Sequence, residues 1–184
     1  MKNKDIFTFR DAEKQAGPVA FSTMLKPAGS ACNLDCGYCY YLDKAAQYGG
    51  RQAVMADDLL ELYIRQYIEA NEVPVVTFCW HGGEPLLLGR DFYRRAVALQ
   101  RKYAAGKRIE NTLQTNGTLV DEAWCELFAE NGFLVGLSLD GPEDIHDAFR
   151  LTKGGRPTFE RVMRTIEMFQ RSGVAVSYTH LRAH

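Results

Sequence analysis

The sequence of 184 residues lacks the features that mark several large classes of protein. It has no run of about 18 apolar residues, which a membrane-spanning helix requires, and its first residues lack the apolar core of a secretory signal peptide. Basic and acidic residues nearly balance, 22 against 23, so no strongly basic face is expected. We therefore expect a cytoplasmic globular protein with no nucleic-acid partner and no membrane partner.

Cysteine is scarce, and its distribution is uneven. Three of the five cysteines, Cys32, Cys36 and Cys39, follow the spacing C-x3-C-x2-C. Cysteine thiolates hold iron–sulfur clusters, normally four to a cluster, so three would leave one iron open to chelate a small molecule. A zinc or disulfide motif is the alternative, although zinc sites usually add a second Cys or His pair. Cys79 and Cys125 stand alone in apolar segments and are predicted to be core residues.

Apolar segments of two kinds alternate along the chain. Short apolar runs bounded by turn residues are typical of buried parallel strands, and longer segments repeat apolar residues at helical spacing. The predicted strands are 21–26, 75–80, 108–115, 133–139 and one from 174, and the predicted helices are 57–71, 90–103, 121–130 and 158–172, with Asp57, Asp121 and Thr158 as N-caps. This order predicts an α/β fold, a parallel sheet with its helices outside.

The length limits how much of such a fold the chain holds. A closed barrel of eight strand–helix units takes about 250 residues, so we expect a partial parallel (β/α) barrel, truncated near the fifth strand. Residues 1–20 are predicted to be a surface leader and residues 21–176 the core domain. The polar and basic segment 177–184 interrupts the apolar strand pattern, and we expect it to be a non-native tail.

Polar and glycine-rich motifs follow four successive predicted strands. They are the cysteine loop, then Gly82-Gly83-Glu84, then Gln-Thr-Asn-Gly-Thr at 114–118, and then Ser138 with Asp140. Because the carboxyl ends of parallel strands meet at one rim, we expect these motifs to converge. A Gly-Gly pair lets the backbone approach a ligand closely, and Glu84 could accept a hydrogen bond from an ammonium group. The alternative is that Gly-Gly-Glu-Pro is only a turn.

In this order the motifs resemble those of the anaerobic sulfatase-maturating enzymes, a family of radical S-adenosylmethionine (SAM) proteins. The matching segments are Cys-Asn-Leu-Asp-Cys-Gly-Tyr-Cys-Tyr-Tyr at 32–41, Gly-Gly-Glu-Pro-Leu at 82–86, 114–118, and Ser-Leu-Asp-Gly-Pro at 138–142 with His146, Asp147 and Arg150. The resemblance implies a [4Fe-4S] cluster and SAM as cofactors. It also implies a sulfatase polypeptide as substrate, a low-potential electron donor, and oxidation of a Cys or Ser to Cα-formylglycine.

The resemblance implies roles for nine residues by position. Cys32, Cys36 and Cys39 would bind the cluster. The SAM contacts would be Tyr38 on the adenine, Gly83 with its neighbours Gly82 and Glu84 on the methionine amino group, and Ser138 with Arg150 at the ribose and carboxylate end. A guanidinium suits a carboxylate because it pairs with it bidentately. The alternative for Arg150 is a solvated loop charge.

The chain also departs from the family pattern. Members continue past the fifth strand to complete the barrel and then carry a Cys-rich extension, the SPASM domain. Their proton acceptor, an aspartate late in the barrel, has no counterpart here, so the catalytic residue is unknown. We expect an N-terminal fragment that does not mature a sulfatase at a useful rate. The alternatives are another SPASM-type maturase forming crosslinks or thioethers, a non-enzymatic iron–sulfur electron-transfer protein, and a zinc-binding interaction module.

Overall fold

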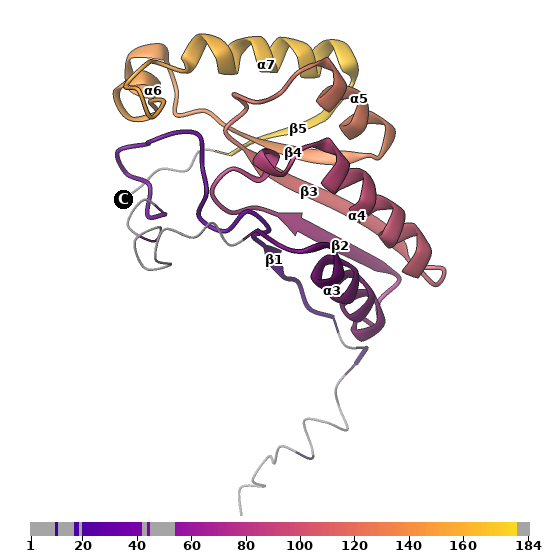
Figure 1. The fold of residues 1–184 in the computed structure, drawn as a ribbon. Helices are drawn as coiled ribbons and strands as arrows, with labels where there is room; N and C mark the ends of the chain where they lie inside the picture. Colours follow the sequence, from indigo (N-terminus) through magenta and orange to yellow (C-terminus); the bar gives the residue numbers. More distant parts are fainter. Residues whose placement is uncertain (1–9, 11–16, 19, 42–43, 45–53, 180–184) are drawn as a thin grey trace, which may run out of the picture.

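The fold is a single sheet of five parallel strands in chain order, as the alternating pattern predicts. A computed structural model of the chain describes residues 10, 17–18, 20–41, 44 and 54–179. The strands are β1 (Met24–Leu25), β2 (Val75–Trp80), β3 (Arg108–Thr115), β4 (Phe133–Ser138) and β5 (Ala175–Thr179). Each strand pairs in parallel with the next, so all their carboxyl ends lie at one edge of the sheet (Figure 1).

Helices connect the strands and lie along one face of the sheet. They are α3 (Asp57–Ala70), α4 (Arg90–Tyr103), α5 (Glu122–Glu130), α6 (Glu143–Phe149) and α7 (Phe159–Ser172), with a short 3-10 helix, η1 (Pro85–Leu88). The four long connecting helices, α3, α4, α5 and α7, form a row over the outer side of the sheet (Figure 1). The sequence predicted these four, and their one-sided arrangement is that of successive parallel crossovers.

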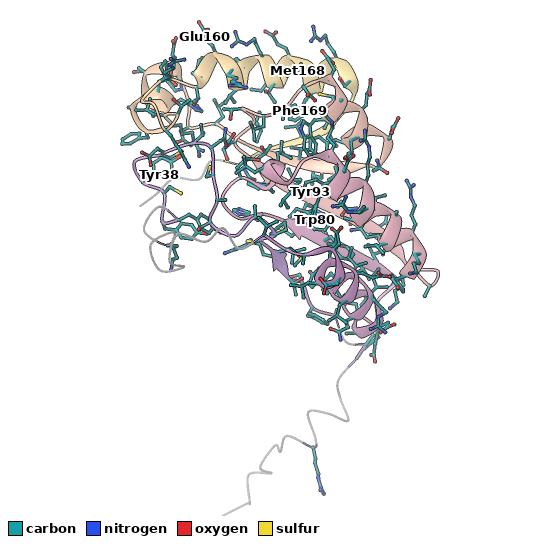
Figure 2. The ribbon with its side chains drawn as sticks, viewed as in Figure 1. Tyr38, Trp80, Tyr93, Glu160, Met168 and Phe169 are labelled. Carbon is teal, nitrogen blue, oxygen red and sulfur yellow. The ribbon has the colours of Figure 1, made fainter. Side chains whose placement is uncertain are left out.

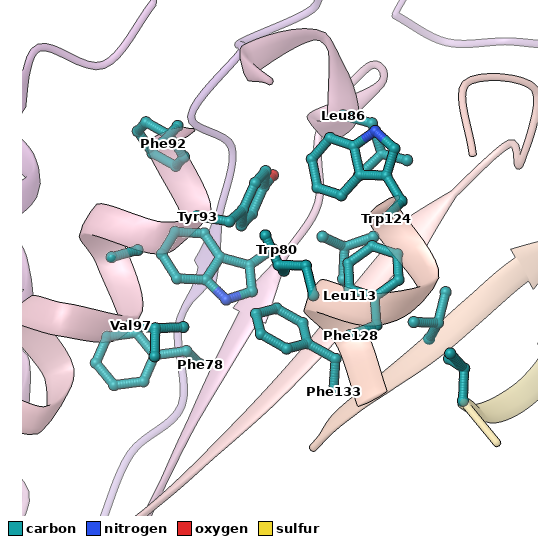
Figure 3. Packing of buried hydrophobic residues seen from close by; sticks show 14 of the residues in the cluster. Phe78, Trp80, Leu86, Phe92, Tyr93, Val97, Leu113, Trp124, Phe128 and Phe133 are labelled. Carbon is teal, nitrogen blue, oxygen red and sulfur yellow. The ribbon is translucent and has the colours of Figure 1, made fainter. Parts of the chain in front are cut away.

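Aromatic side chains fill the space between the sheet and this row of helices. Trp80 and Tyr93 lie at its centre (Figure 2), with ring centroids 5.6 Å apart, and Tyr93 meets Trp124 at the same distance. Trp124 in turn stacks on Phe128 at 5.4 Å, as the close view of this packing shows (Figure 3). Edge-to-face and stacked rings add to the area that they bury, so this layer holds the strands and helices in place behind the rim.

Two predicted helix caps differ from those observed. Asp57 is the first residue of α3 and not its N-cap, which is Ala56 and makes no side-chain cap bond. Thr158 stands at the N-cap of α7, but the capping carboxylate is that of Asp147, whose Oδ1 accepts from the amides of Thr158 (2.8 Å) and Phe159 (2.9 Å). Asp121 does cap α5, since its carboxylate accepts from the Trp124 amide at 3.0 Å.

Three segment boundaries also differ from the prediction. β1 has only two residues of the six predicted, and at the start of the predicted strand the amide of Phe21 donates to the Asn71 side chain. The segment 143–149, for which no helix is predicted, forms α6. β5 pairs with β4 as far as Thr179, so the expected domain boundary at 176 falls inside a strand. Most of the leader and residues 180–184 lie outside the described residues, so the leader and the foreign origin of the tail stay predictions.

Among the described residues, no helix is long and apolar enough to cross a membrane.

Candidate functional site

A pocket of about 210 Å³ lies at the carboxyl ends of the strands. Its walls come from the cysteine loop, from the segment after β2, from the end of β3 with the residue that follows it, from the end of β4 and from the residue after α6. The lining residues are Cys32, Leu34, Cys36, Tyr38, Cys39, Tyr40, Tyr41, His81, Gly82, Gly83, Gln114, Thr115, Asn116, Ser138 and Arg150. Eight of the nine predicted site residues are therefore brought together, and Glu84 is the exception.

The cysteine loop is held by backbone hydrogen bonds on two sides. On one side the amides of Gly83 and Glu84 donate to the carbonyls of Gly29 (2.9 Å) and Ala31 (2.7 Å). On the other side the Asp35 amide donates to the Leu151 carbonyl at 2.8 Å. Figure 2 shows Tyr38 on this loop, at the rim and away from the aromatic core. Main-chain contacts to two distant segments therefore fix the positions of the thiols.

Gly83 is required by a contact within the chain itself. A Cβ built on Gly83 would lie 2.1 Å from the Ala31 carbonyl oxygen and 2.7 Å from that of Ser30. Both are backbone atoms of the cysteine loop and cannot move aside like a flexible side chain. The prediction was that glycine here allows close approach to a ligand, and the structure adds close approach of the cysteine loop.

The carboxylate of Glu84 does not face the pocket. The residue is fully buried, and its Oε1 accepts from the Leu86 amide (3.0 Å) and the Thr115 hydroxyl (2.8 Å). Its Oε2 accepts from the Asn116 amide at 2.8 Å. Burial raises the pKa of this carboxyl to about 7, although the three donors act in the opposite direction. The predicted contact of Glu84 with a ligand ammonium group does not fit this position, and the carboxylate instead ties the end of β2 to the end of β3.

Arg150 and Asp140 form a buried ion pair in the wall beside Cys36. The Nε and Nη2 atoms of Arg150 donate to the two carboxylate oxygens of Asp140 at 2.8 and 3.0 Å. The Tyr38 hydroxyl donates to the same carboxylate, and the guanidinium lies 5.5 Å from the centroid of the Tyr38 ring. Burial acts to raise the pKa of Asp140, but the hydrogen bonds from Arg150 and Tyr38 lower it below its usual value. Arg150 is therefore a paired, buried charge and not a solvated one.

The segment around α6 holds this pair in position. The His146 ring is fully buried; its Nε2 lies 3.0 Å from the Thr158 hydroxyl, and this hydroxyl donates to the Arg150 carbonyl at 2.7 Å. Asp147, next to it, caps α7. His146 and Asp147 therefore fix the backbone around Arg150 through their contacts with Thr158.

Ser138 completes the wall from β4. Its hydroxyl accepts from the Gln114 side chain at 3.0 Å and lies in the pocket lining. A Cβ added to Gly136, the residue of β4 that pairs directly with Gln114 of β3, would lie only 2.1 Å from the Gln114 Oε1. Gly136 therefore leaves room for the amide to reach Ser138.

The nine predicted site residues leave out seven of the lining residues, which are Leu34, Tyr40, Tyr41, His81, Gln114, Thr115 and Asn116. Six of them lie inside the motifs at 32–41 and 114–118, and His81 directly precedes Gly82. Adjacency at a strand end was thus the signal that could have found them. The His81 Nδ1 accepts from the Gly82 amide at 2.7 Å, and burial lowers the pKa of this imidazole.

The three clustered cysteines have the chemistry that an iron–sulfur cluster needs. All five cysteines are free thiols. Burial is the main reason that the pKa of Cys32 is raised and that of Cys36 reaches about 11. Within the described part of the chain, no three His, Cys, Asp or Glu side chains converge as ligands of one metal ion. A cluster binds each thiolate at a different iron, so its ligands need not converge on one point, and the three thiols around one pocket fit such a group.

Comparison with known proteins shows that the chain is similar to radical SAM proteins. The model of the Radical SAM superfamily matches residues 27–181. A serine-type anaerobic sulfatase-maturating enzyme of Bacteroides thetaiotaomicron is 50% identical over 152 residues, which are 82% of this chain and 37% of the relative. A cysteine-type anaerobic sulfatase-maturating enzyme of Clostridium perfringens is 41% identical over 152 residues, 82% of this chain and 41% of the relative.

A solved structure agrees with these sequence relatives. It is described as native anSMEcpe with bound AdoMet and Cp18Cys peptide, and it superimposes with a TM-score of 0.78 at 39% identity. The aligned part is 85% of this chain and 42% of that one. The chain therefore spans less than half the length of each of these three proteins.

Proposed function

The chain belongs to the Radical SAM superfamily, and we propose from this membership that it uses a [4Fe-4S] cluster and SAM to oxidise a residue of a sulfatase polypeptide to Cα-formylglycine. The observation that carries the proposal is the pocket in which three free thiols meet Gly83, Ser138 and Arg150. The relatives named as sulfatase-maturating enzymes support the substrate class. Because serine-type and cysteine-type relatives are both similar, the proposed target is a Ser or a Cys.

The lining residues divide into two groups under this proposal. Cys32, Cys36 and Cys39 would hold the cluster. The SAM molecule would lie beside it, against Tyr38, the Gly82-Gly83 backbone, Ser138 and Arg150. The side chain of Glu84 is excluded from direct contact by its burial, and it acts through the backbone that it holds. When bound, the cluster and SAM supply the one-electron chemistry that removes a hydrogen atom from Cβ of the target residue.

The protein's own contribution is to position the groups that line the pocket. The Arg150–Asp140 pair fixes the ring of Tyr38 through an ion pair, a hydrogen bond and a cation–π contact. Arg150 uses Nε and one N–H of Nη2 on Asp140, and its Nη1 could donate to an anionic ligand group. The supply of electrons is assigned to a separate low-potential donor, because the proposed reaction consumes an electron at the cluster.

One assay with two readouts tests the proposal. The chain is reconstituted anaerobically with iron and sulfide, reduced with dithionite, and given SAM and a sulfatase peptide that carries Ser or Cys at the target position. We expect 5′-deoxyadenosine by chromatography and no more than a trace of aldehyde on the peptide by mass spectrometry, because the chain spans less than half the length of its sulfatase-maturating relatives. The matched controls are Cys36→Ala, which removes a lining thiol, and Cys79→Ala, which removes a thiol of β2 outside the pocket.

The outcomes separate the parts of the proposal. Deoxyadenosine that depends on Cys36 and not on Cys79 supports the cofactors, and the aldehyde supports the substrate. A modified peptide with a crosslink or thioether and no aldehyde would favour another maturase. A cluster that forms but never cleaves SAM would favour the electron-transfer alternative, and zinc in place of iron after anaerobic purification would favour the interaction module.

A further inference from the structure

The sulfur of Cys32 receives two N–H donors from the protein. The backbone amide of Leu34 lies 3.4 Å from the Cys32 Sγ, and the side-chain Nδ2 of Asn116 lies 3.8 Å from it. The first donor belongs to the cysteine loop itself. The second comes from the residue directly after β3, more than eighty residues along the chain.

The surroundings of Asn116 fix the direction of its amide. Its Oδ1 accepts from both the amide (2.9 Å) and the hydroxyl (2.7 Å) of Thr118, so this end of the side chain must be the oxygen. The Nδ2 therefore points to the cysteine loop, where it also donates to the Asn33 Oδ1 at 2.9 Å. The Asn116 backbone amide donates to the buried Glu84 carboxylate, which holds the whole residue at the rim.

The three clustered thiols differ in the N–H donors that their sulfur atoms receive. Within the part of the chain that the structure describes, no comparable N–H donor lies against the sulfur of Cys36 or of Cys39. Cys36 instead lies near the positive charge of Arg150. This charge lowers the pKa of the thiol, but burial raises it by more. Asn116 thus gives one of the three sulfurs a side-chain hydrogen bond that the other two lack.

We propose that Asn116 is a positioning residue that raises the reduction potential of the cluster through its hydrogen bond to Cys32. This inference rests on the proposed function, because it requires the cluster. Hydrogen bonds to the cysteine sulfurs are among the factors that set the potential of an iron–sulfur cluster. An N–H donor stabilises the extra negative charge of the reduced cluster more than it stabilises the oxidised one. Groups that orient the ligands of a metal site tune it in the same way.

The test measures the midpoint potential of the reconstituted cluster by redox titration followed by electron paramagnetic resonance. Asn116→Leu removes the donor, and Asn116→Asp keeps the size but replaces the donor with a charged acceptor. Both variants are expected to shift the potential to more negative values, Asp by more than Leu. The matched control is Asn111→Leu. Asn111 is a similarly buried asparagine, 6% exposed against 8% for Asn116, and within the described residues its side chain bonds to Trp80 and Gln100 and to no cysteine. Its potential should equal that of the wild-type chain.

The measured potentials and cluster contents decide whether Asn116 has this role. A negative shift in both Asn116 variants with an unchanged Asn111→Leu supports the inference. An Asn116→Asp variant with a full cluster and the wild-type potential overturns it. Loss of the cluster in both Asn116 variants, with a full cluster in Asn111→Leu, also overturns it, because Asn116 would then only support the loop. If the wild-type chain takes up no cluster at all, it is the proposed function that fails.

Discussion

The guanidinium of Arg150 lies across both carboxylate oxygens of Asp140, in a pair whose side chains are only 7% and 11% exposed. Removing one partner of such a pair leaves the other charge buried, which costs about 3–5 kcal/mol. We expect Arg150→Ala to lower the free energy of unfolding by about this amount in urea titrations. Arg94→Ala is the matched control, because Arg94 pairs with Asp91 on the surface and such pairs contribute about 1 kcal/mol or less. Equal losses in the two variants would contradict the assignment.

Gly83→Ala should destabilise the cysteine loop. The new Cβ would meet backbone atoms of Ser30 and Ala31, and overpacking of a rigid site costs about 1–3 kcal/mol or more. We expect a lower unfolding midpoint and less iron bound per chain after reconstitution. Gly154→Ala is the control, since its Cβ would find only the Thr152 hydroxyl at 4.0 Å. A Gly83→Ala chain with normal stability and normal iron content would show that the loop does not pack as described.

Cys36→Ala should abolish a stable four-iron cluster, because it removes one of only three lining thiols. Iron and acid-labile sulfide, measured after anaerobic reconstitution, should fall to background. Cys79→Ala, in contrast, should keep the wild-type content. A normal cluster in Cys36→Ala would refute the assignment of the ligands.

The raised pKa of Glu84 should make the free energy of unfolding depend on pH. Its folded pKa, about 7, lies above the ordinary 4.5, so the folded chain binds more protons than the unfolded chain between these values. The contribution of Glu84 to the free energy of unfolding should therefore fall as the pH rises from about 4.5 to about 7 and then stay level. Burial lowers the pKa values of His81 and His146, so these two residues make the free energy of unfolding rise with pH. Their effect is the same in the wild-type chain and in a Glu84→Gln variant, so it cancels when the two are compared.

The measurement is the difference between the wild-type chain and Glu84→Gln, taken from urea unfolding at several pH values without the cluster. The wild-type chain should lose stability relative to Glu84→Gln across this window. A difference that does not change between pH 4.5 and 7 would mean that the carboxyl titrates at its ordinary pKa.

The sequence predicted the strands and helices well wherever local pattern determines them. The observed bounds of β2, α4 and β3 are those predicted, because each is an apolar run or an amphipathic segment between clear turn residues. The four convergent motifs could also be predicted, since parallel strands place their carboxyl ends at one edge. α6 could not, because seven residues between Pro142 and Arg150 carry too weak a helical pattern.

The positions of polar side chains were harder to predict, because their partners are distant in sequence. Nothing local to Glu84 indicates that residues 115 and 116 will satisfy its carboxylate. The same holds for Asp147, which caps a helix eleven residues further on. In both cases the residue type was recognised, but the competition between a ligand and the protein's own donors is decided by tertiary structure.

The backbone bonds between residues 29–31 and residues 83–84 have a consequence for the order of assembly. Loop-closure entropy must be overcome before segments so far apart along the chain can meet, so the cysteine loop gains its final shape only once β2 and the turn after it have formed. Iron that arrives earlier meets thiols with no fixed spacing. We therefore expect the cysteine loop to fold before it takes up metal, unlike small zinc domains, whose metal drives their folding.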